Sequence, residues 1–253
     1  MGKLEGKVAI ITGGGKGIGF GLAKAFAKEG ANLTITGRTM SRLEAAKEKL
    51  EAEYGVKVLP ITADGADEAS VANVVKQTVE TFGHIDTVVN NAQVSKSGVM
   101  LKDHTKEDFD LAIYSGLYAT FFYMRDAYPY LKESKGSVIN FASGAGLFGK
   151  LGQSSYAAAK EGIRGLSRVA AAEWGPDGVR VNVGCPLAMT ESLEQWRDAY
   201  PDLFAKTIQG IPLGRFADPE KDIGRVCVFL ASDDASYVTG ETITLQGGSG
   251  LRP

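Results

Sequence analysis

The feature that most constrains this chain is a regular alternation of short, continuously apolar segments with segments of helical periodicity. Strands that are apolar throughout are buried on both faces, which is typical of a parallel sheet covered by helices. The helical segments between them supply the crossovers that parallel strands need. The sequence therefore predicts an α/β, Rossmann-like, doubly wound parallel sheet of seven strands, at 7–12, 32–36, 56–61, 86–90, 137–141, 179–183 and 241–245.

The 253 residues carry no linker, low-complexity stretch or charged tail, so we expect a single domain over 1–253. One irregular stretch stands out, at 187–216. We expect it to form a substrate lid, because long excursions in compact domains commonly carry binding elements. The longer predicted helices after the first lie at 41–53, 67–82, 106–131, 155–174 and 219–230.

Composition excludes several function classes. The 28 basic and 30 acidic side chains leave a formal charge of −2, too small to gather nucleic acid or an anionic membrane. With two cysteines and two histidines, neither a disulfide framework nor a four-ligand zinc site is expected, and no other metal site. Apolar runs fall far short of the ~20 residues of a membrane span. We expect a cytoplasmic protein with a small-molecule substrate and no nucleic-acid or membrane partner.

A glycine-rich turn follows the first strand and opens the first helix, with Gly13, Gly17 and Gly19 in it. Without side chains here, the backbone can approach a pyrophosphate, whose charge the helix N-terminus stabilises. A purely structural turn is the alternative. The strand before it and the helix after it favour a dinucleotide site.

The end of the second strand predicts which nicotinamide cofactor binds. An acidic side chain there would hold the ribose hydroxyls of NAD and repel a 2′-phosphate. This chain has Gly37 followed by Arg38, a planar cation suited to phosphate, with Lys16 as a second contact. NADP is therefore the expected cofactor, the alternative being that Arg38 only caps a surface turn.

A tyrosine and a lysine stand one helical turn apart, downstream of a serine that ends a strand. Tyr156 and Lys160 share one helix face, and Ser143 follows the fifth strand. Lowering the pKa of a tyrosine from about 10 to about 7 takes roughly 4 kcal/mol of preferential phenolate stabilisation. One ammonium at about 4 Å supplies that amount at an effective dielectric of about 20. The pair is thus suited to acid/base chemistry.

Nearly the whole chain resembles the short-chain dehydrogenases/reductases. The resemblance rests on Thr12-Gly13 to Gly17-Ile18-Gly19, Asn90-Asn91-Ala92, Ser143 and Tyr156-Ala157-Ala158-Ala159-Lys160. It implies that Tyr156 exchanges a proton with the substrate oxygen, that Lys160 holds the nicotinamide ribose and lowers the pKa of the tyrosine, and that Ser143 hydrogen-bonds the reacting group. Hydride passes between nicotinamide and substrate carbon. With the residues above, the expected NADP-binding set is Gly13, Lys16, Gly17, Ile18, Gly19, Gly37, Arg38, Asp64, Asn90, Ala92, Tyr156, Lys160, Pro186 and Thr190.

Three positions depart from the family pattern. Gln93 stands for the glycine after Asn-Asn-Ala, Gly116 for the asparagine before Leu117, and Pro186-Leu187 for Pro-Gly after the sixth strand. In the family that asparagine anchors a water on a proton relay to the lysine, and glycine has no side chain to do so. We hypothesise that a water replaces the asparagine directly, or that another group, for which Gln93 is the candidate, takes part.

A narrower similarity is to the bacterial NADP-dependent 12α-hydroxysteroid dehydrogenases, which interconvert the 12α-hydroxyl of bile acids and the ketone. It rests on these departures, on 109–121 and 185–190, and on the terminal Arg252-Pro253. It implies reversible NADP-dependent oxidation of a secondary alcohol with Tyr156 as acid/base. Two alternatives stay open: an NADPH-dependent reductase of another bulky ketone or a β-ketoacyl thioester, and a catalytically silent nucleotide-binding protein.

A rigid apolar steroid calls for an apolar slot with a few polar groups. The alternative for the aromatic side chains of the lid is packing against the domain or a neighbouring subunit. The resemblance also implies a homotetramer built through the helices at 106–131 and 155–174, where small residues such as Ala157, Gly162, Ala170 and Ala171 would permit close packing. The expected substrate-contacting residues are Gln93, Ser143, Phe148, Leu187, Met189, Leu193 and Trp196.

Overall fold

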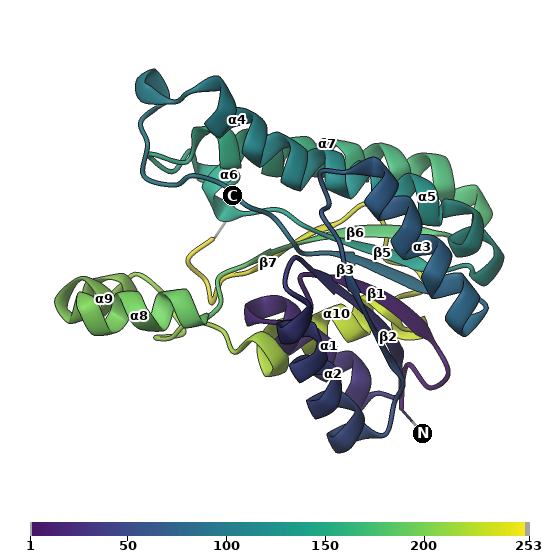
Figure 1. The fold of residues 1–253 in the computed structure, drawn as a ribbon. Coiled ribbons are helices and arrows are strands. Elements are labelled where there is room, and N and C mark those ends of the chain that lie inside the picture. The colour runs from purple at the N-terminus through teal and green to yellow at the C-terminus, as the bar shows by residue number, and fades with distance from the viewer. Residues whose placement is uncertain (1, 251–253) are drawn as a thin grey trace.

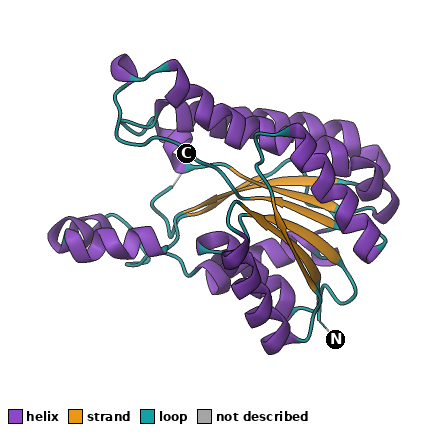
Figure 2. Ribbon diagram, in the orientation of Figure 1, coloured by secondary structure: helices purple, strands orange, loops and turns teal. Residues whose placement is uncertain are grey.

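The structure, a computed structural model, describes residues 2–250 and within them forms one seven-stranded parallel sheet (Figures 1 and 2). The order β3-β2-β1-β4-β5-β6-β7 confirms the predicted doubly wound α/β class. The strands are β1 (Val8–Thr12), β2 (Asn32–Gly37), β3 (Val58–Thr62), β4 (Thr87–Asn90), β5 (Ser137–Phe141), β6 (Arg180–Pro186) and β7 (Thr242–Leu245).

Helices cover both faces of the sheet. Alternate strand residues enter different layers: Ile11 packs on the side of α1, α2 and α10, and Ile10 on the side of α3, α5 and α7 (Figure 1). This two-sided burial is why apolar residues occupy successive positions in the central strands. The helices are α1 (Gly17–Lys28), α2 (Met40–Tyr54), α3 (Glu68–Phe82), α4 (Lys106–Ala112), α5 (Ala119–Ser134), α6 (Gly144–Phe148), α7 (Ser154–Trp174), α8 (Glu191–Ala199), α9 (Pro201–Gln209) and α10 (Arg225–Ala231).

The strand order reverses at β1, which pairs with β2 on one side and β4 on the other. After β1 the chain continues to α1 on one face of the sheet, and after β4 it continues to the loop before α4 on the other face. A crevice at the carboxyl ends of such strands is where open α/β sheets bind ligands. The topology therefore fixes the position of the site before any side chain is considered.

The helix predicted at 106–131 is confirmed, since the chain is helical without a gap over 106–134, but it contains a turn of a different kind. Between α4 and α5 the chain forms a π-helical turn, Ile113–Tyr118. Side chains contact the carbonyls at its start. Ser115 Oγ lies 2.6 Å from Leu111 O and 2.8 Å from Val94 O and has one proton for the two carbonyls, while Gln93 Nε2 donates to Ala112 O at 3.3 Å. These polar contacts replace bonds of a regular α-helix, and single π turns of this kind are common at functional sites.

Within 187–216, α8 and α9 form a helical pair that projects away from the sheet (Figure 1). The two ends of this segment are tied together: Met189 N donates to Ala217 O at 2.9 Å, and Ala217 N donates to Leu187 O at 3.0 Å. Neither helix contains a buried residue. The segment is thus attached at a narrow base and makes few contacts with the body.

Some of the small residues expected at a subunit interface also permit close packing within the chain. Ala170 and Ala171 are buried in the core between α7 and the sheet. A Cβ on Gly162 would stand 2.8 Å from Leu117 Cδ2 of the π-helical turn. Arg252-Pro253 lies outside the described residues. Between residues 2 and 250 no helix has both the length and the apolarity to cross a membrane.

Candidate active site

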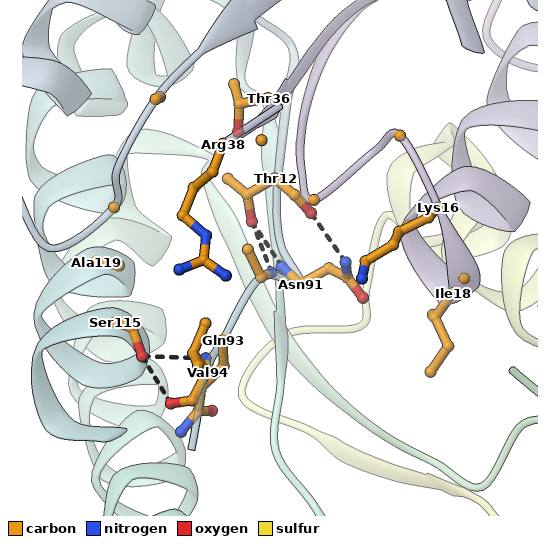
Figure 3. A pocket seen from close by; sticks show the side chains of 18 of the residues that line it. Thr12, Lys16, Ile18, Thr36, Arg38, Asn91, Gln93, Val94, Ser115 and Ala119 are labelled. Atoms are coloured by element: carbon orange, nitrogen blue, oxygen red, sulfur yellow. Dashed lines mark hydrogen bonds between the residues drawn. The ribbon is translucent and has the colours of Figure 1, made fainter. Parts of the chain in front are cut away.

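A cavity of about 440 Å³ opens at the carboxyl ends of β1, β2 and β4 (Figure 3). It lies at the point of strand-order reversal, as the topology requires. Most of the expected cofactor residues line it, whereas Tyr156, Lys160 and Pro186 do not. The lining members of that set are Gly13, Lys16, Gly17, Ile18, Gly19, Gly37, Arg38, Asp64, Asn90, Ala92 and Thr190.

The glycine turn has a geometry that only glycine allows at two of its positions. Gly13 and Gly17 have φ of +71° and +54°. A Cβ on Gly19 would overlap the carbonyl oxygen of Gly13. The turn therefore leaves its backbone open to the cavity at the N-terminus of α1, an arrangement that fits a pyrophosphate.

A hydrogen-bonded clamp holds the exits of β1 and β4 together (Figure 3). Thr12 Oγ1 accepts from Asn91 N at 2.9 Å and from Ala92 N at 3.0 Å. Asn91 Nδ2 donates to Thr12 O at 2.9 Å. The floor of the cavity is thus fixed by short bonds between two strands.

Three cations border the cavity. Lys16, Arg38 and Arg42 are exposed, and none forms an ion pair with a carboxylate of residues 2–250. Gly37 beside them carries no side chain. Arg42 was not predicted from the sequence, although it is a basic residue in the first turn of α2, close in sequence to Arg38. An unpaired basic cluster beside a dinucleotide turn fits an additional phosphate.

Ser143, Tyr156 and Lys160 come together beside the cavity. Ser143 Oγ caps α6 by accepting from Ala145 N at 3.1 Å and also hydrogen-bonds Tyr156. Lys160, only 4% exposed, donates from Nζ to Phe141 O at 2.7 Å. Its Nζ lies 5.5 Å from the centroid of the Tyr156 ring. The predicted spacing on α7 thus produces one contiguous group.

Burial dominates the electrostatics of this group. Burial raises the pKa of Tyr156, the hydrogen bond with Ser143 opposes that rise, and nearby Cys185 adds to it. Burial also lowers the pKa of Lys160 from 10.5 to about 8. Burial is thus the largest influence on the pKa of Tyr156 here, and the lowering of that pKa by Lys160, which the resemblance implies, stays a prediction.

Of the expected substrate residues outside the Ser143 group, only Gln93 lines the cavity. Phe148 on α6 is 54% exposed. Trp196 lies inside the helical pair, with its ring centroid 6.0 Å from that of Phe204. Thr190 lies at the cavity edge, and its Oγ1 caps α8 by accepting from Leu193 N at 3.3 Å. Leu187 and Met189 form the base of the projecting segment.

Two polar contacts made by neighbours of the Ser143, Tyr156 and Lys160 group were not predicted from the sequence. His104 Nε2 lies 2.8 Å from Ser155 Oγ at the start of α7. Asn90 Nδ2 donates to Asn140 Oδ1 at 2.8 Å, joining β4 to β5. No cluster of three or more His, Cys, Asp or Glu side chains within 2–250 could hold a metal ion.

Comparison with known proteins agrees with this architecture. A family model described as enoyl-(acyl carrier protein) reductase matches residues 13–249. The chain is 62% identical to a 12α-hydroxysteroid dehydrogenase of Clostridium sp., covering 100% of both chains. It is 36% identical to a 3-oxoacyl-(acyl-carrier-protein) reductase FabG of Thermotoga maritima, covering 97% of this chain and 98% of the relative.

Among solved structures, the crystal structure of levodione reductase superimposes with a TM-score of 0.92 at 34% identity, with 98% of each chain covered. Fold, site and relatives together define an oxidoreductase of the nicotinamide-dependent kind. The chain belongs to the short-chain dehydrogenase/reductase family.

Proposed function

We propose that this protein oxidises a secondary alcohol reversibly to a ketone with NADP, at the 12α-hydroxyl of bile acids. The observation that carries the chemistry is the contiguous group of Ser143, Tyr156 and buried Lys160 beside the cavity. The 62% identity to a 12α-hydroxysteroid dehydrogenase over the full length of both chains supports the substrate class.

The choice of NADP is supported by the charges at the cavity mouth. Lys16, Arg38 and Arg42 would hold the 2′-phosphate, since no carboxylate pairs with them within the described chain. Gly37 presents no carboxylate that would repel it. The open backbone at Gly13 would accept the pyrophosphate.

The residues of this chain then perform the proton chemistry. When bound, NADP supplies the acceptor for the hydride and a positive charge on its oxidised ring. Tyr156 Oη removes the proton of the substrate hydroxyl, and Ser143 Oγ holds the same oxygen by a hydrogen bond. Lys160, charged below a pH of about 8, stabilises the phenolate. In reduction Tyr156 returns the proton to the ketone oxygen.

The proposal is tested by following nicotinamide absorbance with purified protein. Deoxycholate carries a 12α-hydroxyl, chenodeoxycholate a 7α-hydroxyl instead, and both carry a 3α-hydroxyl. We expect NADP reduction with deoxycholate alone, and much weaker reduction of NAD. Silence on deoxycholate together with turnover of a ketone or β-ketoacyl thioester would favour the reductase alternative. Absence of turnover with every one of these substrates, together with binding of NADP, would favour a catalytically silent nucleotide-binding protein.

We also propose a homotetramer assembled through the outer faces of the π-helical turn, α5 and α7. Tyr118 and Phe121 are 42% and 37% exposed, and Val169 on α7 is 54% exposed. Apolar side chains exposed along adjacent helices are typical of subunit contacts. Sedimentation should give a tetramer for the wild type and smaller species for Tyr118→Asp, and a monomeric wild type would refute this assembly.

A further inference from the structure

Gln93 and Gly116 are sterically interlocked. An ideal Cβ built on Gly116 would stand 2.6 Å from Gln93 Cδ, 2.7 Å from Nε2 and 2.9 Å from Oε1. The carboxamide of Gln93 therefore fills the space into which a side chain at position 116 would project. Gln93 reaches this space from the loop after β4, at the edge of the cavity (Figure 3).

The two ends of this carboxamide have different surroundings. Nε2 donates to Ala112 O, a carbonyl at the start of the π-helical turn. Oε1 is buried and accepts no hydrogen bond from any described residue. A buried acceptor without a donor costs about 1–3 kcal/mol, so such an atom is commonly satisfied by an ordered water or a bound group.

The surroundings of Gln93 connect it to the acid/base group. Val94, the next residue, is bonded to Ser115 through both backbone groups, at 3.1 Å for N to Oγ and 2.8 Å for Oγ to O (Figure 3). The π-helical turn packs through Leu117 against Gly162 of α7. That helix also carries Lys160, whose ammonium donates one hydrogen bond, to Phe141 O, within residues 2–250.

We propose that Gln93 is a positioning residue of the active site: its carboxamide enters the gap left by Gly116, and its Oε1 holds an ordered water beside the acid/base group. Water is the fitting donor because a site that contains amide, hydroxyl and ammonium groups offers it several partners. The inference rests on the proposed oxidation for its kinetic consequences, whereas the interlock with Gly116 stands independently of the substrate.

The interlock predicts non-additive effects of two small substitutions. In Gly116→Ala the new methyl group displaces the flexible end of Gln93 rather than backbone, so the fold survives. This variant and Gln93→Ala should each lower kcat about tenfold with unchanged KM for NADP, and the double variant should also lose about tenfold. Losses that multiply to about a hundredfold would overturn the proposal.

Two comparisons of variants distinguish a positioning role of Gln93 from a role in packing alone. Gly165→Ala is the matched control, because a Cβ there meets nothing within 4 Å, and it should leave kcat unchanged. Gln93→Glu keeps an acceptor oxygen and should recover more of kcat than Gln93→Met, which keeps only the length of the chain. Equal kcat values for Gln93→Glu and Gln93→Met would overturn the role of Oε1.

A crystal structure decides the geometry whatever the substrate proves to be. In the wild type a water should lie within about 3 Å of Gln93 Oε1. In Gly116→Ala the carboxamide should leave its position, and the water should be lost. A carboxamide that stays in place, or an Oε1 with no water, would overturn the inference. Absence of turnover on deoxycholate by the wild type would instead contradict only the proposed function.

Discussion

Lys160 is a basic side chain that is buried in the folded protein, and its burial should have a measurable effect on the free energy of unfolding. Its side chain is 4% exposed, and burial lowers its pKa from 10.5 to about 8. Because the pKa in the folded protein lies below that in the unfolded chain, the unfolded chain binds more protons between these values. Stability should therefore rise with pH across this window, and the cost of charging Lys160 is fully present below pH 8.

The magnitude follows from the shift. A shift of one pKa unit corresponds to about 1.36 kcal/mol. The lowering of the Lys160 pKa from 10.5 to about 8 therefore reduces the free energy of unfolding by about 3 kcal/mol when the ammonium is charged. Between pH 7 and pH 10, Lys160 should contribute a gain of roughly 2–3 kcal/mol in the free energy of unfolding. Lys160→Met lacks this titrating group, while the other titrations remain largely common to both proteins.

Urea unfolding of wild type and Lys160→Met, at fixed protein concentration and at several values of pH from 7 to 10, measures this difference. The wild type should gain stability relative to the variant as pH rises, and the variant should lose turnover. A stability difference that is constant over the range would refute the reasoning that burial penalises the ammonium.

Three further predictions concern the cavity and the chemistry. Thr12→Val leaves the N–H groups of Asn91 and Ala92 without their acceptor, so the free energy of unfolding should fall by about 2 kcal/mol; a urea midpoint equal to that of the wild type would contradict the clamp. Tyr156→Phe should lower kcat by about a hundred- to ten-thousand-fold with unchanged NADP affinity, measured by fluorescence titration, and retained turnover would exclude the acid/base role. Gly37→Asp places a carboxylate beside the proposed phosphate site, so NADP affinity should fall about tenfold or more relative to NAD; equal affinities in variant and wild type would remove the cofactor assignment.

Local sequence determined much of the fold. The seven strands were predictable because each contains closely spaced apolar and β-branched residues, as strands of a parallel sheet covered by helices require. The glycine turn was predictable because Gly13 and Gly17 adopt positive φ at the entrance to α1. The strand ends shifted by a few residues, since capping and pairing rather than hydrophobicity set them.

Features that depend on distant contacts could not be predicted. The π-helical turn within 106–131 depends on Gln93, nineteen positions before its acceptor Ala112. The electrostatics of Tyr156 depend on burial, whereas helical spacing revealed only the proximity of Lys160. The contact of Trp196 with Phe204 within the helical pair was not apparent from the sequence, and its contact with substrate stays a prediction.

The central claim is that Tyr156 and NADP act on one particular hydroxyl group. Cholate offers 3α-, 7α- and 12α-hydroxyls in one molecule, so the enzyme itself selects among them. After incubation with purified protein and NADP, carbon NMR of the product identifies the oxidised position. The account predicts a single ketone at carbon 12, with no product from Tyr156→Phe. A ketone at carbon 3 or 7, or unchanged cholate, would contradict it.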